Sequence, residues 1–287
     1  MHIIKYTFVV INLILYLITG CILRLVLIKA NPNVYIRAIN RLTYYLMHSF
    51  KLIGGFKIKI LGNKDVLKEK GLFIISTHVG YIDGIILGTL APGTFTTKGE
   101  IKTTPFLGQI VSLGKSIFIN RERKNQIVDY VHQMTNRLSN KINVFCFPEG
   151  HASDGTKILK FFPAFFDAPL KAATPIIPVS IDYQKINGKP ITNRDAICCY
   201  DGKVSIFKHL WGLLKFRTID VTIQIHDRIQ PNGFQGNSKD RRLVSDLCMK
   251  RFAEYTKLPI ADDHPLVQRA PSAPITSETR REEPIVR

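Results

Sequence analysis

Acidic residues are scarce in this sequence of 287 residues. It holds 22 aspartates and glutamates against 40 lysines and arginines, so its formal net charge is +18 at pH 7. Such an excess of positive charge favours a polyanionic partner: a nucleic acid, an anionic membrane surface or a phosphorylated substrate. Hydrophobic residues make up 45% of the chain. It can therefore build one large globular domain, and its length does not require two.

Cysteine is scarce as well, and the five cysteines follow no pattern typical of a metal site or a disulfide framework. They include no Cys-x-x-Cys pair, and the adjacent Cys198 and Cys199 would make a poor disulfide. We therefore expect a reducing compartment and no bound metal. The sequence also has no internal repeat and no Gly-x-Ser-x-Gly, the nucleophile motif of many lipases and serine hydrolases.

Charge is absent altogether from residues 6–23, a run of 18 residues. As a helix this run would be about 27 Å long, close to the thickness of the hydrocarbon core of a bilayer. We expect a membrane anchor, with a helix lying in the interface or a signal peptide as alternatives. Only Lys5 precedes the run among the lysines and arginines, whereas several follow it. The positive-inside rule therefore places the body of the protein in the cytoplasm.

The rest of the chain alternates between strand and helix patterns. Residues 34–51 form an amphipathic pattern, typical of a helix that either packs on the core or lies on an anionic membrane surface. From Gly54 onward, short apolar strands recur, with helical patterns at residues 125–139 and 239–258. This order predicts an α/β fold with a mixed, mostly parallel sheet flanked by helices, following an N-terminal membrane-associated helical segment. We expect three regions: an anchor with the amphipathic helix at 1–52, a folded domain at 53–264 and a disordered tail at 265–287.

The first candidate site follows the expected strand at residues 72–76, where His78 precedes Asp83 by five positions. On a continuous helix that separation would place the two side chains about 140° apart. If residues 77–82 form a turn, with Gly80 supplying flexibility, the side chains can converge. Asp83 would then lie in the first turn of a helix, where the helix dipole favours its charge. A histidine held by a carboxylate can act as a general base toward a hydroxyl, although such a pair taken alone is more often structural.

Two further strand ends carry charged residues. Arg121 follows the expected strand at residues 116–119, and Glu149 follows the one at residues 142–147 in a Pro-Glu-Gly turn. Such a turn presents a carboxylate and open backbone N–H groups, which can bind a phosphate or a hydroxyl. Each could also be an ordinary strand-ending turn with surface charge. Because the carboxyl ends of strands in such sheets meet in one crevice, the three ends together suggest a single site.

These residues belong to four ordered motifs, and through them the sequence resembles the glycerolipid acyltransferase family, typified by 1-acyl-sn-glycerol-3-phosphate acyltransferase. The resemblance covers roughly residues 54–183. Residues 98–108 also resemble the family's linker between its first two motifs. The motifs consist of His78 and Asp83 (His-x4-Asp); Gly114, Phe118 and Arg121 (Gly-x-x-Phe-x-x-Arg); Phe147, Pro148, Glu149 and Gly150 (Phe-Pro-Glu-Gly); and a fourth block at residues 174–181 centred on Pro178.

The resemblance implies acyl transfer from a thioester, either acyl-CoA or acyl carrier protein, to the hydroxyl of a lysophospholipid. The first expectation for this acceptor is 1-acylglycerol-3-phosphate, which would yield phosphatidate. His78 would remove the hydroxyl proton and Asp83 would orient the histidine, while Arg121 would bind the acceptor's phosphate. Glu149 and Gly150 would position its polar head. The remaining residues of the expected substrate-binding set are Lys98 and Gly114. We expect no metal, no cofactor and no nucleic-acid partner, and an active site on the cytoplasmic side of a membrane with an anionic surface.

The sequence departs from the family's pattern directly after Phe-Pro-Glu-Gly. The family usually continues with Thr-Arg-Ser, whereas this chain has His151, Ala152 and Ser153. The missing arginine removes a contact to an anionic head group, which His151 or Lys157 could replace. Residues 153–166 also resemble a branch that includes lyso-ornithine lipid acyltransferases. The alternatives are therefore an acyltransferase for another lysolipid such as lyso-ornithine lipid, a lipid hydrolase, and a non-catalytic binder of anionic lipid or nucleic acid.

Overall fold

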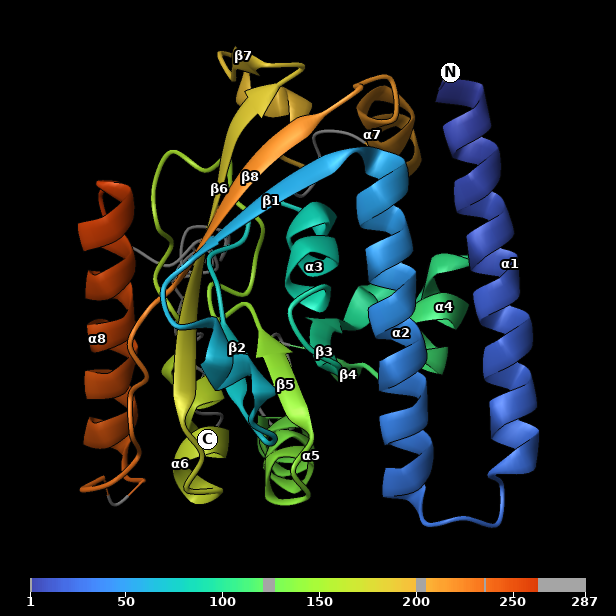
Figure 1. Cartoon of the computed structure of the whole chain (residues 1–287). Helices are drawn as coiled ribbons and strands as arrows, with labels where there is room; N and C mark the ends of the chain where they lie inside the picture. Colours follow the sequence, from blue (N-terminus) through green and yellow to red (C-terminus); the bar gives the residue numbers. More distant parts are fainter. Residues whose placement is uncertain (1, 121–126, 200–204, 235, 263–287) are drawn as a thin grey trace, which may run out of the picture.

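The computed structural model of the protein describes residues 2–120, 127–199, 205–234 and 236–262, and within them eight strands form one sheet (Figure 1). Its strand order is β1-β8-β6-β2-β5-β3-β4, and β7 pairs with β6. The strands are β1 (Phe56–Leu61), β2 (Phe73–Ile75), β3 (Gly93–Lys98), β4 (Ile117–Ile119), β5 (Asn143–Cys146), β6 (Ile176–Ile186), β7 (Lys189–Pro190) and β8 (Ile219–Ile225).

The sheet is mixed and mostly parallel, which confirms the predicted fold class. Strands β6, β2, β5, β3 and β4 all run in one direction. Strand β8 pairs antiparallel with β6, and β1 pairs parallel with β8, so these two run the opposite way. The carboxyl ends of the five parallel strands therefore lie along one edge of the sheet, where α/β proteins place their ligands.

Helices cover both faces of the sheet. Neighbouring residues of the central strands point to opposite sides, and the apolar side chains on each side pack against helices. Phe73 and Ile75 pack into one buried cluster with residues of α5, α6 and α8, whereas Ile74 packs into a second cluster with residues of α3 and α7. Burial on both faces explains why these short strands are apolar throughout. The helices are α1 (His2–Val26), α2 (Pro32–Gly54), α3 (Tyr81–Gly88), α4 (Leu107–Leu113), α5 (Ile127–Ser139), α6 (Asp167–Lys171), α7 (Ile206–Leu213) and α8 (Ser238–Thr256).

The amphipathic segment predicted at residues 34–51 is helix α2, and its apolar face packs on the core. Pro32 opens the helix after the Asn31 cap, and Gly55 ends it in the left-handed conformation with φ 74°. A side chain at Gly55 would also collide with the carbonyl oxygen of Arg217. In the middle of the helix, the buried Asn40 donates a hydrogen bond to Thr94 Oγ1 of β3 at 3.0 Å. Of the two interpretations of this pattern, packing on the core is the one that the structure shows.

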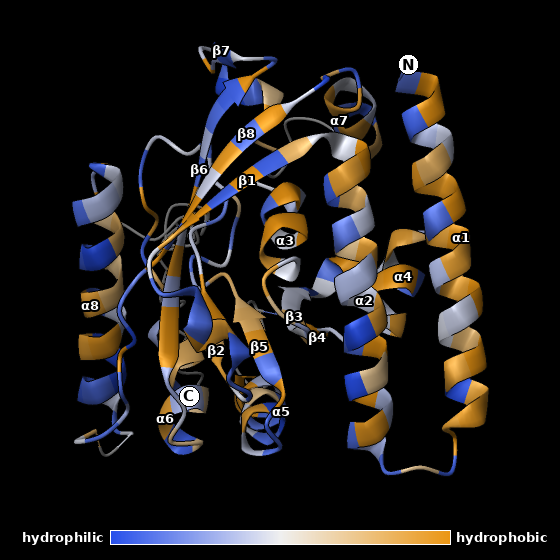
Figure 2. Cartoon of the chain, in the orientation of Figure 1, coloured by the Kyte–Doolittle hydropathy of each residue, from blue (hydrophilic) through white to orange (hydrophobic). Residues whose placement is uncertain are grey.

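Helix α1 contains the uncharged run and lies alongside α2 (Figure 1). Tyr16 hydrogen-bonds Thr43 of α2 at 3.1 Å, and a side chain at Gly20 would collide with Leu113 of α4. The remaining surface of α1 is largely apolar and exposed (Figure 2), and only 17% of its most apolar stretch of 18 residues is buried. By length and composition α1 could cross a membrane. However, its contacts with the rest of the protein extend over most of its length.

The expected strands are all present, and so are the helices predicted near residues 125–139 and 239–258. The helices α4, α6 and α7 and the short strand β7 were not predicted. The division of the chain at residues 52 and 264 stays a prediction. The first of these boundaries falls within the last turn of α2, and the expected tail at 265–287 lies outside the described residues.

Candidate functional site

The loop between β2 and α3 brings His78 and Asp83 together, as predicted. Asp83 lies in the first turn of α3 and is 1% exposed. Its Oδ2 accepts hydrogen bonds from His78 Nδ1 at 2.9 Å and from the backbone N–H groups of Val79 and Gly80 at 2.6 and 3.0 Å. The carboxylate thus caps its own helix while holding the imidazole. The chain turns back between the two residues, which is why a spacing of five does not separate them.

The second oxygen of Asp83 binds a residue that the sequence analysis missed. Tyr183, on β6, donates its hydroxyl to Asp83 Oδ1 at 2.7 Å. Burial, reinforced by the neighbouring Asp83 charge, raises the pKa of the Tyr183 hydroxyl well above its usual value, so it remains a donor. Counting in twos along β6 from the buried Ile177 places Tyr183 on the same face of the sheet as α3. That periodicity was the signal that could have found it.

The imidazole of His78 is held from two directions and stays accessible. Phe147, of the Phe-Pro-Glu-Gly motif, stacks on it with ring centroids 4.0 Å apart and planes 18° apart. The His78 side chain is 21% exposed. Since Nδ1 faces Asp83, the Nε2 atom lies on the opposite side of the ring, where a substrate hydroxyl could reach it. This arrangement can perform general base catalysis.

Glu149 lies directly behind the histidine, and its carboxylate points to the backbone. The residue is completely buried. Its Oε2 accepts a hydrogen bond from the backbone N–H of His78 at 2.9 Å, and its Oε1 accepts one from the N–H of Leu159 at 3.0 Å. Burial raises the pKa of Glu149 well above its usual value, while these two N–H groups act in the opposite direction. Glu149 therefore ties the loop after β2 to the segment after β5. Its expected role in binding the acceptor stays a prediction.

The residues after Glu149 form a turn that rests on the histidine. Gly150 adopts φ 74° and donates its N–H to Phe147 O at 3.0 Å. Ser153 donates its backbone N–H to the carbonyl of His78 at 2.8 Å. Ala152, which stands where the family usually has arginine, lies between these contacts and is partly exposed. The segment that departs from the family's pattern is therefore part of the wall around His78.

The remaining predicted residues lie toward β3 and β4. Lys98 is the last residue of β3, and it pairs with Ile119 of β4. Gly114 ends α4, where a side chain would approach the hydroxyl of Tyr16 of α1 to 3.0 Å. Arg121 lies outside the described residues, so its expected contact to the acceptor stays a prediction. Strand order thus places the motif residues along one edge, with His78 after β2, Glu149 after β5 and Lys98 at the end of β3.

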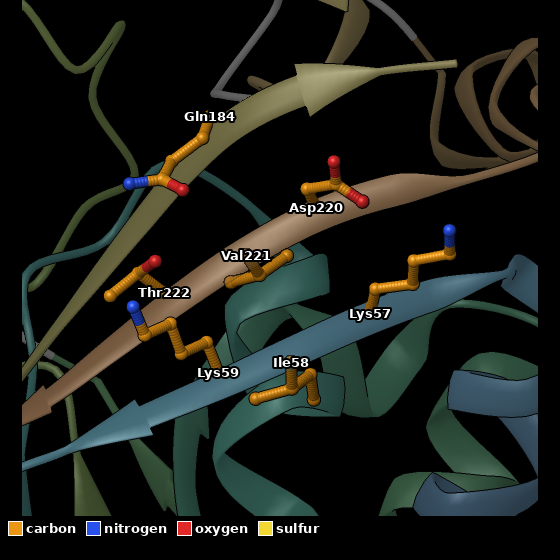
Figure 3. Close-up of a pocket in the computed structure, with 7 residues that line it drawn as sticks. All are labelled: Lys57, Ile58, Lys59, Gln184, Asp220, Val221 and Thr222. Atoms are coloured by element: carbon orange, nitrogen blue, oxygen red, sulfur yellow. The ribbon is translucent and has the colours of Figure 1, made fainter. Parts of the chain in front are cut away.

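Two further observations delimit the site. Among the described residues, no three histidine, cysteine, aspartate or glutamate side chains are placed to hold a metal ion. An open hollow lies over β1, β8 and β6 (Figure 3), and the motif residues do not line it, so we do not assign the site there. The hollow is lined by Lys57, Ile58, Lys59, Gln184, Asp220, Val221 and Thr222.

Comparisons with known proteins point to acyltransferases. Residues 57–182 match the sequence model of the family described as Acyltransferase. The lyso-ornithine lipid O-acyltransferase of Rhizobium meliloti (strain 1021) is 25% identical over 211 residues, which cover 71% of this chain and 72% of that protein. The 1-acyl-sn-glycerol-3-phosphate acyltransferase of Neisseria gonorrhoeae is 26% identical over 196 residues, which cover 67% of this chain and 71% of that protein.

A solved structure shares the fold. The crystal structure of the 1-acyl-sn-glycerophosphate acyltransferase PlsC from Thermotoga maritima superposes with a TM-score of 0.55 at 19% sequence identity. The match covers 90% of this chain and 98% of that one.

Proposed function

Because this chain belongs to the acyltransferase family through residues 57–182, we propose that it transfers a fatty acyl group from a thioester to the hydroxyl of a membrane lysolipid. The observation that carries the proposal is the hydrogen bond of 2.9 Å between His78 Nδ1 and the buried Asp83 Oδ2. It fixes the tautomer in which Nε2 can accept a proton. The acyl donor is acyl-CoA or an acylated carrier protein.

The reaction needs one proton transfer and one acyl transfer. His78 Nε2 takes the proton from the acceptor hydroxyl as its oxygen attacks the thioester carbonyl. The negatively charged Asp83 stabilises the imidazolium that forms. When the tetrahedral intermediate collapses, the carbon–sulfur bond breaks and the thiolate leaves, receiving the proton from His78. The acyl group becomes an ester on the acceptor, without an acyl-enzyme intermediate.

The protein around the pair holds it in place during these steps. Glu149 fixes the backbone of His78, and Phe147 fixes its ring. Arg121, which follows β4 in the sequence, would supply a planar guanidinium for the phosphate of the acceptor. Lys98 adds a positive charge at the same edge of the sheet. Gly150, with φ 74°, lets the chain turn beside His78.

There are two candidate acceptors for this site. The first is 1-acylglycerol-3-phosphate, the acceptor in the name of the Neisseria relative, with phosphatidate as product. The second is lyso-ornithine lipid, the acceptor in the name of the Rhizobium relative. The second is favoured by Ala152, because a phosphate monoester carries nearly two negative charges and the site lacks the family's second arginine.

We place the enzyme at a membrane, with the site on the cytoplasmic side. Both acceptors are membrane lipids, and α1 exposes an apolar surface (Figure 2). Helix α1 contacts the body of the protein from Lys5, which binds the carbonyl of Phe216, to Gly20. A helix attached over that length lies in the membrane interface more readily than it crosses the bilayer. The excess of lysine and arginine would favour an anionic leaflet.

The test is an acceptor panel. Purified full-length protein in detergent receives one labelled acyl-CoA with lysophosphatidate, lyso-ornithine lipid or no acceptor, and an acylated carrier protein replaces acyl-CoA in a parallel series. We expect an acylated product with at least one lysolipid, and none from His78→Ala. Release of free fatty acid without an acceptor would indicate a hydrolase. A His78→Ala protein with unchanged product formation would refute the mechanism.

A further inference from the structure

Helix α7 exposes a small aromatic face to solvent. Phe207 is 57% exposed and Trp211 is 38% exposed. They are four residues apart, so they lie on the same side of the helix. Lys208 on the same helix and Lys215 and Arg217 just after it are exposed cations. Because the opposite side of α7 is already buried through His209 and Leu213, the core does not account for this second apolar face.

This face continues onto the exposed surface of α1. Trp211 makes edge contacts with His2 and Tyr6, with ring centroids 5.1 and 5.2 Å apart. Lys5 fixes the junction by donating to the carbonyl of Phe216 at 2.8 Å. In Figure 1, α7 lies beside the first turns of α1. We call the joint surface the α1–α7 surface; it consists of Ile3, Phe207 and Trp211, all exposed.

The buried side of α7 connects to the catalytic loop. Tyr81, three residues after His78, hydrogen-bonds His209 Nδ1 at 3.0 Å, and the two rings also meet edge to face. The chain before α7 reaches the same loop, since Cys199 donates its N–H to the carbonyl of Val79 at 2.8 Å. Helix α7 therefore has the catalytic loop on one side and the exposed aromatic face on the other.

We propose that the α1–α7 surface binds the interface of an anionic phospholipid bilayer, with α7 as a second membrane contact beside α1. Tryptophan and phenylalanine favour the headgroup level of a membrane, and flanking lysines and arginines attract anionic lipids. This contact sets the catalytic loop close to the bilayer surface, where a lysolipid hydroxyl is found. The inference rests on the proposed function, because it assumes an acceptor held in a membrane.

The chain offers its own probe, since Trp211 is its only tryptophan. Full-length protein is reconstituted into vesicles of phosphatidylethanolamine and phosphatidylglycerol, in which part of the lipid is brominated either near the headgroup or deep in the acyl chain. We expect emission at a shorter wavelength than in water, and stronger quenching by the bromine near the headgroup. Unquenched emission from protein that floats with the vesicles would overturn the proposal, as would stronger quenching by deep bromine. A blue shift that depends on protein concentration in detergent alone would show that a second copy covers the face, and would also overturn it.

A pair of variants tests the surface independently of the probe. Phe207→Asp should weaken partitioning onto the anionic vesicles about 10-fold, because it replaces an inserted aromatic ring with a charge that the lipid repels. The matched control is Leu243→Asp on α8, at the opposite side of the molecule in Figure 1, where Leu243 is 60% exposed. It should change partitioning less than about two-fold. Equal losses in both variants would refute the proposal. Neither readout requires catalysis, so failure here and failure of acyl transfer are distinguishable.

Discussion

The hydrogen bond from Tyr183 to Asp83 makes a specific prediction about catalysis. Oδ1 of Asp83 accepts the Tyr183 hydroxyl at 2.7 Å, whereas the other three hydrogen bonds of this carboxylate all reach Oδ2. Tyr183→Phe removes that donor and leaves Oδ1 buried without it. The carboxylate then keeps three of its four hydrogen bonds and is held less firmly toward His78, which weakens its stabilisation of the imidazolium. A hydrogen bond to a charged group contributes about 1.5–3 kcal/mol, which corresponds to roughly 10- to 150-fold.

We therefore expect kcat of Tyr183→Phe to fall about 10-fold or more, with KM for both substrates changed less than about three-fold. The assay is the release of free CoA during acyl transfer in detergent micelles. Tyr35→Phe is the matched control, because the buried Tyr35 hydroxyl has no hydrogen-bond partner among the described residues. It should retain wild-type kcat. A Tyr183→Phe enzyme with kcat within two-fold of wild type would refute the reasoning, and a rise in acceptor KM alone would place Tyr183 against the substrate instead.

Four further predictions concern the same site. His78→Ala and Asp83→Ala should each lower kcat about 100- to 10,000-fold. The double variant should lose little more activity than either single variant, because the two residues act as a unit. A His78→Ala enzyme with a third of the wild-type rate would contradict this. Glu149→Gln should lower the melting temperature by several degrees and reduce kcat, since its amide NH₂ faces a backbone N–H; unchanged melting would show that the loops do not depend on Glu149. Ala152→Arg should raise the ratio of kcat/KM for lysophosphatidate over lyso-ornithine lipid about 10-fold or more, and an unchanged ratio would remove this residue from head-group selection. Arg121→Ala should raise KM for the acceptor and Arg121→Lys should restore it poorly; a rise in KM for acyl-CoA alone would assign Arg121 to the donor.

The sequence predicted the elements that carry a strong local pattern. The central strands are buried on both faces, so they are short apolar runs bounded by polar turns, as at Phe73–Ile75. The pairing of His78 with Asp83 could be predicted because a turn with Gly80 is local, and the two residues are only five apart. The antiparallel direction of β8 could not be predicted from a local pattern, because the pairing of strands depends on contacts between distant segments.

The same limit explains what was missed in the site. The hydrogen bonds of Glu149 were not predicted: both of its oxygens accept from backbone N–H groups, one of them from Leu159 ten residues later. Tyr183 contacts Asp83 across 100 positions of the sequence. Helix α7 spans only eight residues, fewer than the length over which a helical period can be recognised, so its packing on the catalytic loop defines it. In each case the missing information is a contact across the fold.

The pairing of β1 with β8 has a consequence for the order in which the protein can fold. Phe56 pairs with Ile219, and Lys5 donates a hydrogen bond to the carbonyl of Phe216. These contacts near the start of the chain therefore need a segment more than 160 residues later. During synthesis, α1 can pack on α2 early, but β1 cannot pair with β8 until β8 has left the ribosome. Contacts so distant in sequence also slow folding. Over that interval α1 exposes its apolar surface, and early capture by a membrane would protect the unfinished chain from aggregation.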